Sequence, residues 1–159
     1  MIDEKSLQIL KILQQKARVP NVEVARQVNM APSAVLERIR KLEKQGIIDG
    51  YEVILNPRRF NKSLVSFIHV FLVDITKREA VGESLVEIPE IQEIHFITGQ
   101  DCFLLKLRVA DITQLNDLIE NKIGSVRYVS KTETSVALAT LKESSQIPLD
   151  LTIINEQGK

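Results

Sequence analysis

The sequence predicts an α+β chain in which a helix-turn-helix domain precedes a ferredoxin-like βαββαβ domain. Up to about residue 46 the apolar residues recur at helical spacing, whereas beyond residue 62 they form extended segments separated by two helical ones. The charge divides near the same place. Residues 1–60 contain 11 Lys/Arg against 7 Asp/Glu, a balance of +4, and residues 61–159 contain 10 against 14, a balance of −4. We therefore expect two parts with different roles, and we expect any polyanion to bind the first.

Composition excludes several classes of protein. An apolar fraction of 44% with 26% charged residues is typical of a globular chain. The longest apolar run, residues 64–73, is too short to span a bilayer, and the charged N-terminus predicts no secretory signal. A single cysteine, Cys102, fits a reducing compartment. We expect a cytoplasmic protein with no membrane partner.

The first two helices follow from capping and breaking signals. Asp3 can cap a helix whose apolar stripe extends through about Lys16. Pro20 prevents this helix from continuing. Asn21 is a favourable N-cap for a short second helix that ends near Val28.

The third helix completes a helix-turn-helix. Asn29 tolerates the left-handed conformation that a tight turn requires, and Pro32 suits the first turn of the next helix. The small Ala25 lies where the second and third helices would cross. Two short helices joined by about three residues form the helix-turn-helix arrangement. Gly46 is expected to end the third helix in a left-handed conformation.

The polar face of the third helix is the candidate DNA-binding site. In this motif the second helix enters the major groove with its N-terminal residues toward the base edges. Ala31 is a poor cap, so backbone N–H groups stay free to meet a phosphate. Basic residues on the same face can neutralise phosphates. The candidate residues are Pro32, Ser33, Ala34, Glu37, Arg38, Arg40, Lys41 and Lys44.

Two alternatives stay open for this helix. Its charged face could simply be solvated, since Glu37 and Glu43 accompany the basic residues. Arg38 lies near the boundary with the apolar stripe, so it could instead form an intramolecular ion pair with a carboxylate of the first helix. The helix-turn-helix spacing favours DNA binding for the helix as a whole.

The remaining elements have the order βαββαβ, which is that of the ferredoxin-like split unit. Residues 47–57 alternate enough to predict a strand that Asn56-Pro57 ends, and the Arg58-Arg59 pair that follows either contacts DNA flanks or is solvated. Beyond this hinge we expect strands at 64–75, 91–98 and 103–109, helices at 77–88 and 111–123, and one or two strands over 126–141. The predicted domains are therefore residues 1–50, a linker at 51–62, residues 63–142, and a C-terminal extension at 143–159.

The predicted sheet has an uncovered face. Residues 64–75 are apolar on both alternating faces, but the two helices can cover only one side of the sheet. The other side needs a cover, most simply the sheet of a second subunit. We therefore expect a homodimer, and we expect Ile68 or Val70 to face the partner.

The stretch "VARQVNMAPSAVLERIRKLEKQGIIDGYEVILNP", residues 24–57, resembles the DNA-binding half of the Lrp/AsnC family, the feast/famine regulators. The similarity covers residues 3–149, although the family usually has Gly where this chain has Asn29 and Ser where it has Ala31. It implies a winged helix-turn-helix transcriptional regulator that binds sequence-specific sites on double-stranded DNA. It also implies a C-terminal ligand-sensing and assembly domain, with dimers that form a tetramer of dimers, an octamer.

The resemblance further implies an amino-acid effector. Family members place Gly, two variable residues and Asp before an apolar strand, in a turn that lines the effector pocket. The segment "TGQDCFLLKL" keeps Gly99 but has Cys102 at the Asp position, with Asp101 one residue earlier. We expect a weak or absent response to common amino acids, or a different effector held by backbone groups. The candidate residues are Gly99, Gln100, Asp101, Cys102, Thr132, Thr134 and Ser135.

No pattern in the sequence indicates catalysis or a cofactor. The six glycines are scattered, and neither an HExxH nor a CxxC pattern occurs. His69 and His95 lie within predicted strands and are interpreted as structural residues. Two other functions stay open: an architectural DNA-binding protein of the same fold without an effector, and an enzyme or regulatory subunit of amino-acid metabolism.

Overall fold

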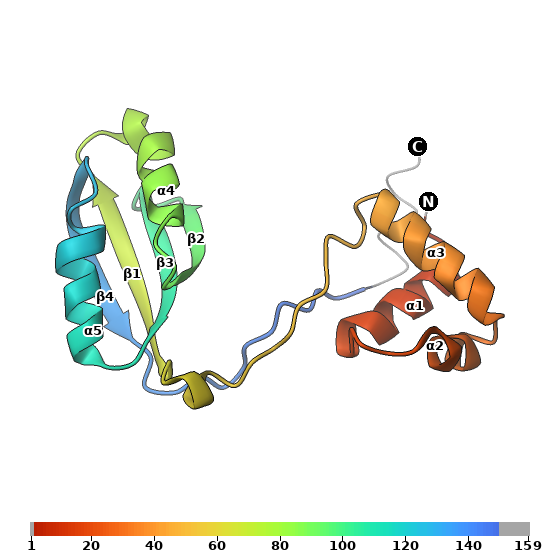
Figure 1. Cartoon of the computed structure of the whole chain (residues 1–159). Helices are drawn as coiled ribbons and strands as arrows, with labels where there is room; N and C mark the ends of the chain where they lie inside the picture. The colour runs from red at the N-terminus through yellow and green to blue at the C-terminus, as the bar shows by residue number, and fades with distance from the viewer. Residues whose placement is uncertain (1, 150–159) are drawn as a thin grey trace. The chain divides into compact units, whose positions relative to one another are not determined.

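The computed structural model describes residues 2–149 and divides into two compact units (Figure 1). The first unit combines the N-terminal segment through Ile54 with the C-terminal segment from Glu143, and the second unit is Leu55–Lys142. Part of the expected C-terminal extension, residues 150–159, lies outside the described residues.

The first unit contains the three predicted helices, α1 (Glu4–Gln15), α2 (Asn21–Val28) and α3 (Pro32–Lys44). Asp3 caps α1 as predicted and accepts a hydrogen bond from the Ser6 N–H at 2.8 Å. The predicted cap of α2 is wrong by one residue, because Pro20 occupies the N-cap position. Its fixed φ suits the entry to a helix, and its carbonyl accepts from the Glu23 N–H at 2.9 Å.

The three helices share one apolar core. Ile9 of α1, Val24 of α2 and Val35 of α3 are each fully buried, and Ala25 is 2% exposed. Burying each such side chain stabilises the fold by about 1.5–3 kcal/mol. The core therefore fixes which face of α3 points inward.

Both predicted left-handed residues are confirmed. Asn29 has a φ of 52°, and this turn lets the Met30 N–H donate to the Ala25 carbonyl at 3.0 Å. Gly46 has a φ of 64°, and the Ile47 N–H donates to the Leu42 carbonyl at 2.9 Å. Backbone hydrogen bonds thus close the turns before and after α3.

An ion pair ties α3 to the start of α1. Arg38 Nη1 donates to Asp3 Oδ2 at 2.5 Å and to Ser6 Oγ at 3.1 Å. This confirms the alternative in which Arg38 pairs within the molecule. The Arg38 guanidinium and the Ser6 N–H together lower the pKa of Asp3 to about 2.

The strand predicted over residues 47–57 is wrong for the described chain. Residues 51–56 are without regular structure, and Val53 and Ile54 are 82% and 93% exposed. A strand exists only by pairing with a neighbour. The alternating pattern is present, but residues 51–56 have no ladder partner among the described residues.

The second unit has the predicted βαββαβ order. The elements are η1 (Pro57–Phe60), β1 (Leu64–Leu72), η2 (Ile75–Lys77), α4 (Arg78–Val86), β2 (Ile91–Ile97), β3 (Cys102–Val109), α5 (Ile112–Asp117) with η3 (Leu118–Ile123), and β4 (Val129–Val136). The four strands form one antiparallel sheet in the order β2-β3-β1-β4. Helix α4 follows β1 and α5 follows β3, as expected for the ferredoxin-like fold, and α5 continues as the π-helical turn η3.

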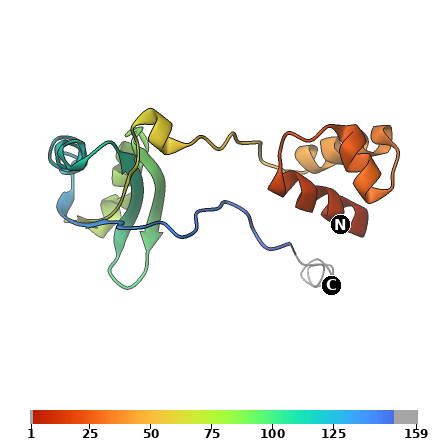
Figure 2. The ribbon, with the colours of Figure 1, turned by 90° about the horizontal axis from the view of Figure 1, so that it is seen from below.

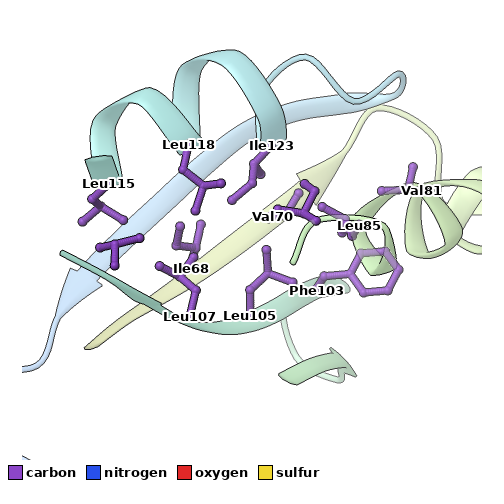
Figure 3. Close-up of a cluster of buried hydrophobic side chains, with 12 residues drawn as sticks. Ile68, Val70, Val81, Leu85, Phe103, Leu105, Leu107, Leu115, Leu118 and Ile123 are labelled. Carbon is purple, nitrogen blue, oxygen red and sulfur yellow. The ribbon is translucent and has the colours of Figure 1, made fainter. Parts of the chain in front are cut away.

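Both helices of the second unit pack on the same side of the sheet (Figures 1 and 2). Figure 3 shows Ile68 and Val70 of β1 pointing with Leu105 toward the helices, where Leu118 meets them. Both Ile68 and Val70 are fully buried in this core. The expectation that one of them faces a partner subunit is therefore wrong, because residues two apart on a strand share a face.

The opposite face of the sheet carries the other residues of β1. Val65 is 6% exposed and Phe67 is 37% exposed, whereas His69 and Phe71 are half-buried with ring centroids 6.4 Å apart. Lys131 of β4 lies over the Phe71 ring, 4.4 Å from its centroid. No helix of the second unit covers this face, which we call the open face. Among the described residues no helix is long and apolar enough to cross a membrane.

We predict that the Asp3–Arg38 pair makes stability depend on pH in the acid range. The folded pKa of Asp3, about 2, is below its ordinary value of 3.8. The stabilisation is therefore present above about pH 4 and is lost as the pH falls toward 2. Asp3→Asn keeps the cap but removes the charge. Because the ion pair is half-exposed, we expect Asp3→Asn to lower the free energy of unfolding by less than about 1 kcal/mol at pH 6.

Chemical unfolding followed by circular dichroism between pH 6 and pH 3 measures this effect. The difference between wild type and Asp3→Asn should shrink as the pH falls. Asp49→Asn, at another exposed carboxylate of the same unit, serves as the control. An unchanged difference across the range would contradict the assignment to this ion pair.

Candidate nucleic-acid interface and effector site

The geometry of α3 separates a buried stripe from an exposed face. Val35, Ile39 and Leu42 recur at helical spacing and are at most 7% exposed. At 3.6 residues per turn the opposite side of the helix carries Ser33 and Lys44. All predicted DNA-binding residues except Arg38 and Ala34 are exposed: Pro32, Ser33, Glu37, Arg40, Lys41 and Lys44.

The N-terminus of α3 offers backbone donors. Ala31 occupies the N-cap position and makes no side-chain capping hydrogen bond, and Pro32 is the first helical residue. The first turn of a helix leaves N–H groups without an intrahelical partner. Ser33 and Ala34 supply such groups here, and they lie beside the Ser33 hydroxyl.

The basic side chains of α3 differ in their surroundings. Arg40, Lys41 and Lys44 are exposed, and within the described residues none of them forms an ion pair. Arg38 is instead held by Asp3 and points toward α1. The structure therefore brings together Ser33, Arg40, Lys41 and Lys44 on one face but places Arg38 elsewhere.

Two contacts that sequence reasoning missed support this arrangement. Lys5 of α1 donates from Nζ to the Val28 carbonyl at 2.7 Å, at the end of α2. Tyr51 donates its hydroxyl to Glu43 Oε1 at 2.9 Å, and burial together with that carboxylate raises the pKa of Tyr51 to about 12. A cation near a helix C-terminus is a known signal, but only the fold shows which helix Lys5 reaches.

The predicted effector turn is the hairpin between β2 and β3. Figure 2 shows this hairpin projecting at one end of the sheet. Gly99 has a φ of 92° and Asp101 a φ of 49°, and both are exposed. Cys102 is fully buried, and burial raises the pKa of its thiol, so a neutral group stands at the position where the resemblance predicts a carboxylate. The Asp101 side chain lies in the turn instead.

The hydroxyl residues of β4 do not join this turn within one chain. Thr132 is in register with Val70, which is in register with Phe103. Two strand spacings, about 10 Å, therefore separate Thr132 from β3. Thr134 lies on the same side of the sheet as Thr132, whereas Ser135 pairs with Phe67 and lies on the open face.

The two histidines that remain as candidate catalytic or metal-binding residues lie apart from each other on the sheet. His95 is exposed beside Glu93 at 3.4 Å, and His69 packs near Phe71. In the part of the chain that the structure describes, no group of His, Cys, Asp and Glu could hold a metal ion.

Comparisons with known proteins identify the family of each of the two domains. Residues 2–49 match the model of the winged helix-turn-helix DNA-binding family, and residues 65–147 match that of the Lrp/AsnC ligand binding domain. The chain is 33% identical over 150 residues to the leucine-responsive regulatory proteins of Klebsiella pneumoniae and of Escherichia coli K12. Each alignment covers 92% of this chain and 90% of the relative.

Several solved structures of transcriptional regulators are similar to this chain over nearly its whole length. A transcriptional regulator from Neisseria meningitidis in complex with L-methionine is 28% identical, with a TM-score of 0.90 over 94% of this chain and 98% of that one. AsnC from Escherichia coli is 25% identical, with a TM-score of 0.86 over 93% and 99% of the two chains. A feast or famine regulatory protein from M. tuberculosis with L-methionine is 25% identical, with a TM-score of 0.85 over 92% and 99%.

Two family models thus cover the helix-turn-helix and the sheet domain in the expected order, and relatives match nearly the full length. The chain belongs to the Lrp/AsnC family of DNA-binding transcriptional regulators, with an N-terminal winged helix-turn-helix domain and a C-terminal ligand-binding domain.

Proposed function

We propose that this protein binds sequence-specific sites on duplex DNA with α3 as its recognition helix. The observation that carries the proposal is the exposed face of α3, where Arg40, Lys41 and Lys44 have no intramolecular ion pair among the described residues. Each contact to a phosphate releases counterions and strengthens binding on any sequence. Ser33 and Ala34, at the N-terminus of the helix, are the residues that approach base edges.

Glu37 lies in the centre of this face and is exposed. A carboxylate near DNA repels phosphates, but it can accept a hydrogen bond from the N4 amino group of cytosine in the major groove. We assign Glu37 to base reading and the surrounding cations to phosphate contacts. Arg38 contributes by holding α3 on α1 and not by touching DNA.

The first prediction for DNA binding separates these roles. Lys41→Ala should weaken binding to all sequences and reduce the salt slope by about one unit, because one phosphate contact is lost. Arg40→Ala should act in the same way. Ser33→Ala and Glu37→Gln should change the preference among sites and leave the salt slope nearly unchanged.

Titration of duplex DNA at several salt concentrations measures both quantities. Lys11→Ala is the matched control, because Lys11 is an exposed lysine of α1 in the same unit. If Lys41→Ala folds normally and keeps both the affinity and the salt slope of the control, α3 does not dock as proposed.

We also propose that two copies of the chain dimerise through the open face. Phe67 and the half-buried His69 and Phe71 leave apolar surface on this side, and a second sheet would cover it. A dimer places two recognition helices about a two-fold axis, with half-sites roughly 34–36 Å apart or at a multiple of that spacing. The family further suggests a tetramer of dimers.

Phe67→Glu should therefore dissociate the dimer and lower the affinity for a two-half-site operator. Val86→Glu is the control, since Val86 is an exposed apolar residue of the same unit, on α4. Ultracentrifugation gives the mass, and circular dichroism verifies folding. A wild-type protein that is monomeric yet retains full operator affinity would contradict the dimer.

For the ligand-binding domain we propose an amino-acid effector at the β2–β3 turn. Relatives are described in complex with L-methionine, which supports this class of ligand. The turn residues Gly99–Cys102 can offer backbone donors and acceptors, and hydroxyls such as that of Ser135 would have to come from another copy of the chain. We further propose that the protein acts without catalysis and is located in the cytoplasm.

Because Cys102 replaces a carboxylate, we predict weak amino-acid binding. Loss of a charge-assisted hydrogen bond to the effector ammonium costs about 1.5–3 kcal/mol, roughly tenfold to a hundredfold in affinity. Calorimetric titration with the twenty amino acids measures this, and Cys102→Asp should bind more tightly by that factor. Thr98→Asp places a carboxylate elsewhere in the turn as a control.

Submicromolar binding of an ordinary amino acid, insensitive to changes at Gly99, Asp101 and Cys102, would place the pocket elsewhere. Complete absence of binding, together with normal DNA affinity, would favour the architectural role without an effector.

A further inference from the structure

The C-terminal segment after the sheet domain returns to the first unit and contacts α1. Gln14 Nε2 donates to the Ile147 carbonyl at 2.8 Å, and the Ile147 N–H donates to Gln14 Oε1 at 3.2 Å. In addition, the Gln146 side chain donates from Nε2 to the backbone carbonyl of Gln14 at 2.9 Å. Three hydrogen bonds thus join two residues of the segment to a single residue of α1, and 132 or 133 positions separate them in sequence.

The chemistry of these contacts is specific to an amide side chain. The Gln14 side chain both donates to and accepts from the backbone of one residue, as a neighbouring strand would. A carboxylate cannot donate, and an ammonium cannot accept. Glutamine at position 14 therefore matches an extended backbone that lies beside the helix.

The backbone carbonyl of Gln14, which accepts from Gln146, lies at the helix end where hydrogen-bond acceptors lack intrahelical donors. It belongs to the last turn of α1, which ends at Gln15 and contains no basic residue. The last four carbonyls of a helix have no intrahelical partner. Gln146 satisfies one of them, so the returning segment of the same chain caps the C-terminal end of α1.

Apolar side chains extend the contact. An open cavity of about 890 Å³ is lined by Leu10 of α1 and by Ile47 and Tyr51 of the loop after α3, with Ile147 and Pro148 of the returning segment along it. All of these residues belong to the first unit. The segment thus forms one wall of an apolar depression on the DNA-binding domain.

We propose that Ser145–Leu149 is a docking segment that binds α1 of the DNA-binding domain in the same chain through the Gln14 amide. The sheet domain is then joined to the DNA-binding domain at both of its ends, by the covalent linker before β1 and by the docked segment after β4. A change in the sheet domain can therefore reach the helices by two routes. This inference does not depend on which ligand the sheet domain binds.

Disulfide trapping in the full-length protein tests the contact. Gln14→Cys combined with Ile147→Cys should form a disulfide under mild oxidation, which peptide mapping identifies while Cys102 stays buried. We expect the product to migrate as a single chain on a non-reducing denaturing gel. Gln8→Cys with Ile147→Cys is the matched control, because Gln8 is a half-buried residue of α1 about 9 Å away along the axis.

Two results would overturn the proposal. Equal trapping of the test and control pairs would show that the segment has no fixed seat on α1. A disulfide found only between two chains would show that the segment docks on a second copy.

Hydrogen exchange provides a measurement without new cysteines. Gln14→Ala removes two of the three hydrogen bonds, so the Ile147 amide should exchange about twofold to tenfold faster than in wild type. Gln8→Ala should leave this rate unchanged. Unchanged exchange in Gln14→Ala, with α1 still protected, would also overturn the docking of the segment.

Discussion

The packing of α3 against α1 and α2 is the constraint on which the orientation of the exposed, proposed DNA-binding face of α3 depends. Val35 and Ile39 enter a core with Ile9 and Val24, and this burial leaves only one orientation for the helix. Because a helix is a rigid cylinder, fixing its apolar stripe also fixes its polar face. The Asp3–Arg38 pair acts on the same interface, since it joins the flank of α3 to the cap of α1.

A different constraint applies to the sheet domain: successive side chains along a strand point to opposite faces of the sheet. Alternate residues of β1 enter the core under α4 and α5, so the intervening residues must face the other way. With both helices on one side, the open face is left to whatever surface meets it. We therefore propose that the open face serves assembly and that the β2–β3 hairpin end serves ligand binding, because the helices of the unit use neither.

Side-chain hydrogen bonds between different segments add contacts that local sequence patterns do not predict. Lys5 reaches the end of α2, Tyr51 reaches Glu43, and Gln14 reaches Ile147. Each supplies a partner to a helix end or helix surface that the local sequence leaves unpaired. The DNA-binding domain is therefore built from both ends of the chain, although its motif is confined to one.

The sequence alone determined the three helices, the left-handed Asn29 and Gly46, and the βαββαβ order, because capping residues and apolar periodicity act over one or two turns. It also identified the exposed face of α3, since that face is the complement of the apolar stripe. The tertiary structure decided the rest. It assigned Arg38 to Asp3 and placed Ile68 and Val70 under the helices. It also left residues 51–56 without a strand partner among the described residues and seated Ile147 on Gln14. These outcomes depend on contacts between residues far apart in sequence, and periodicity records which residues are apolar but not which surface they will meet.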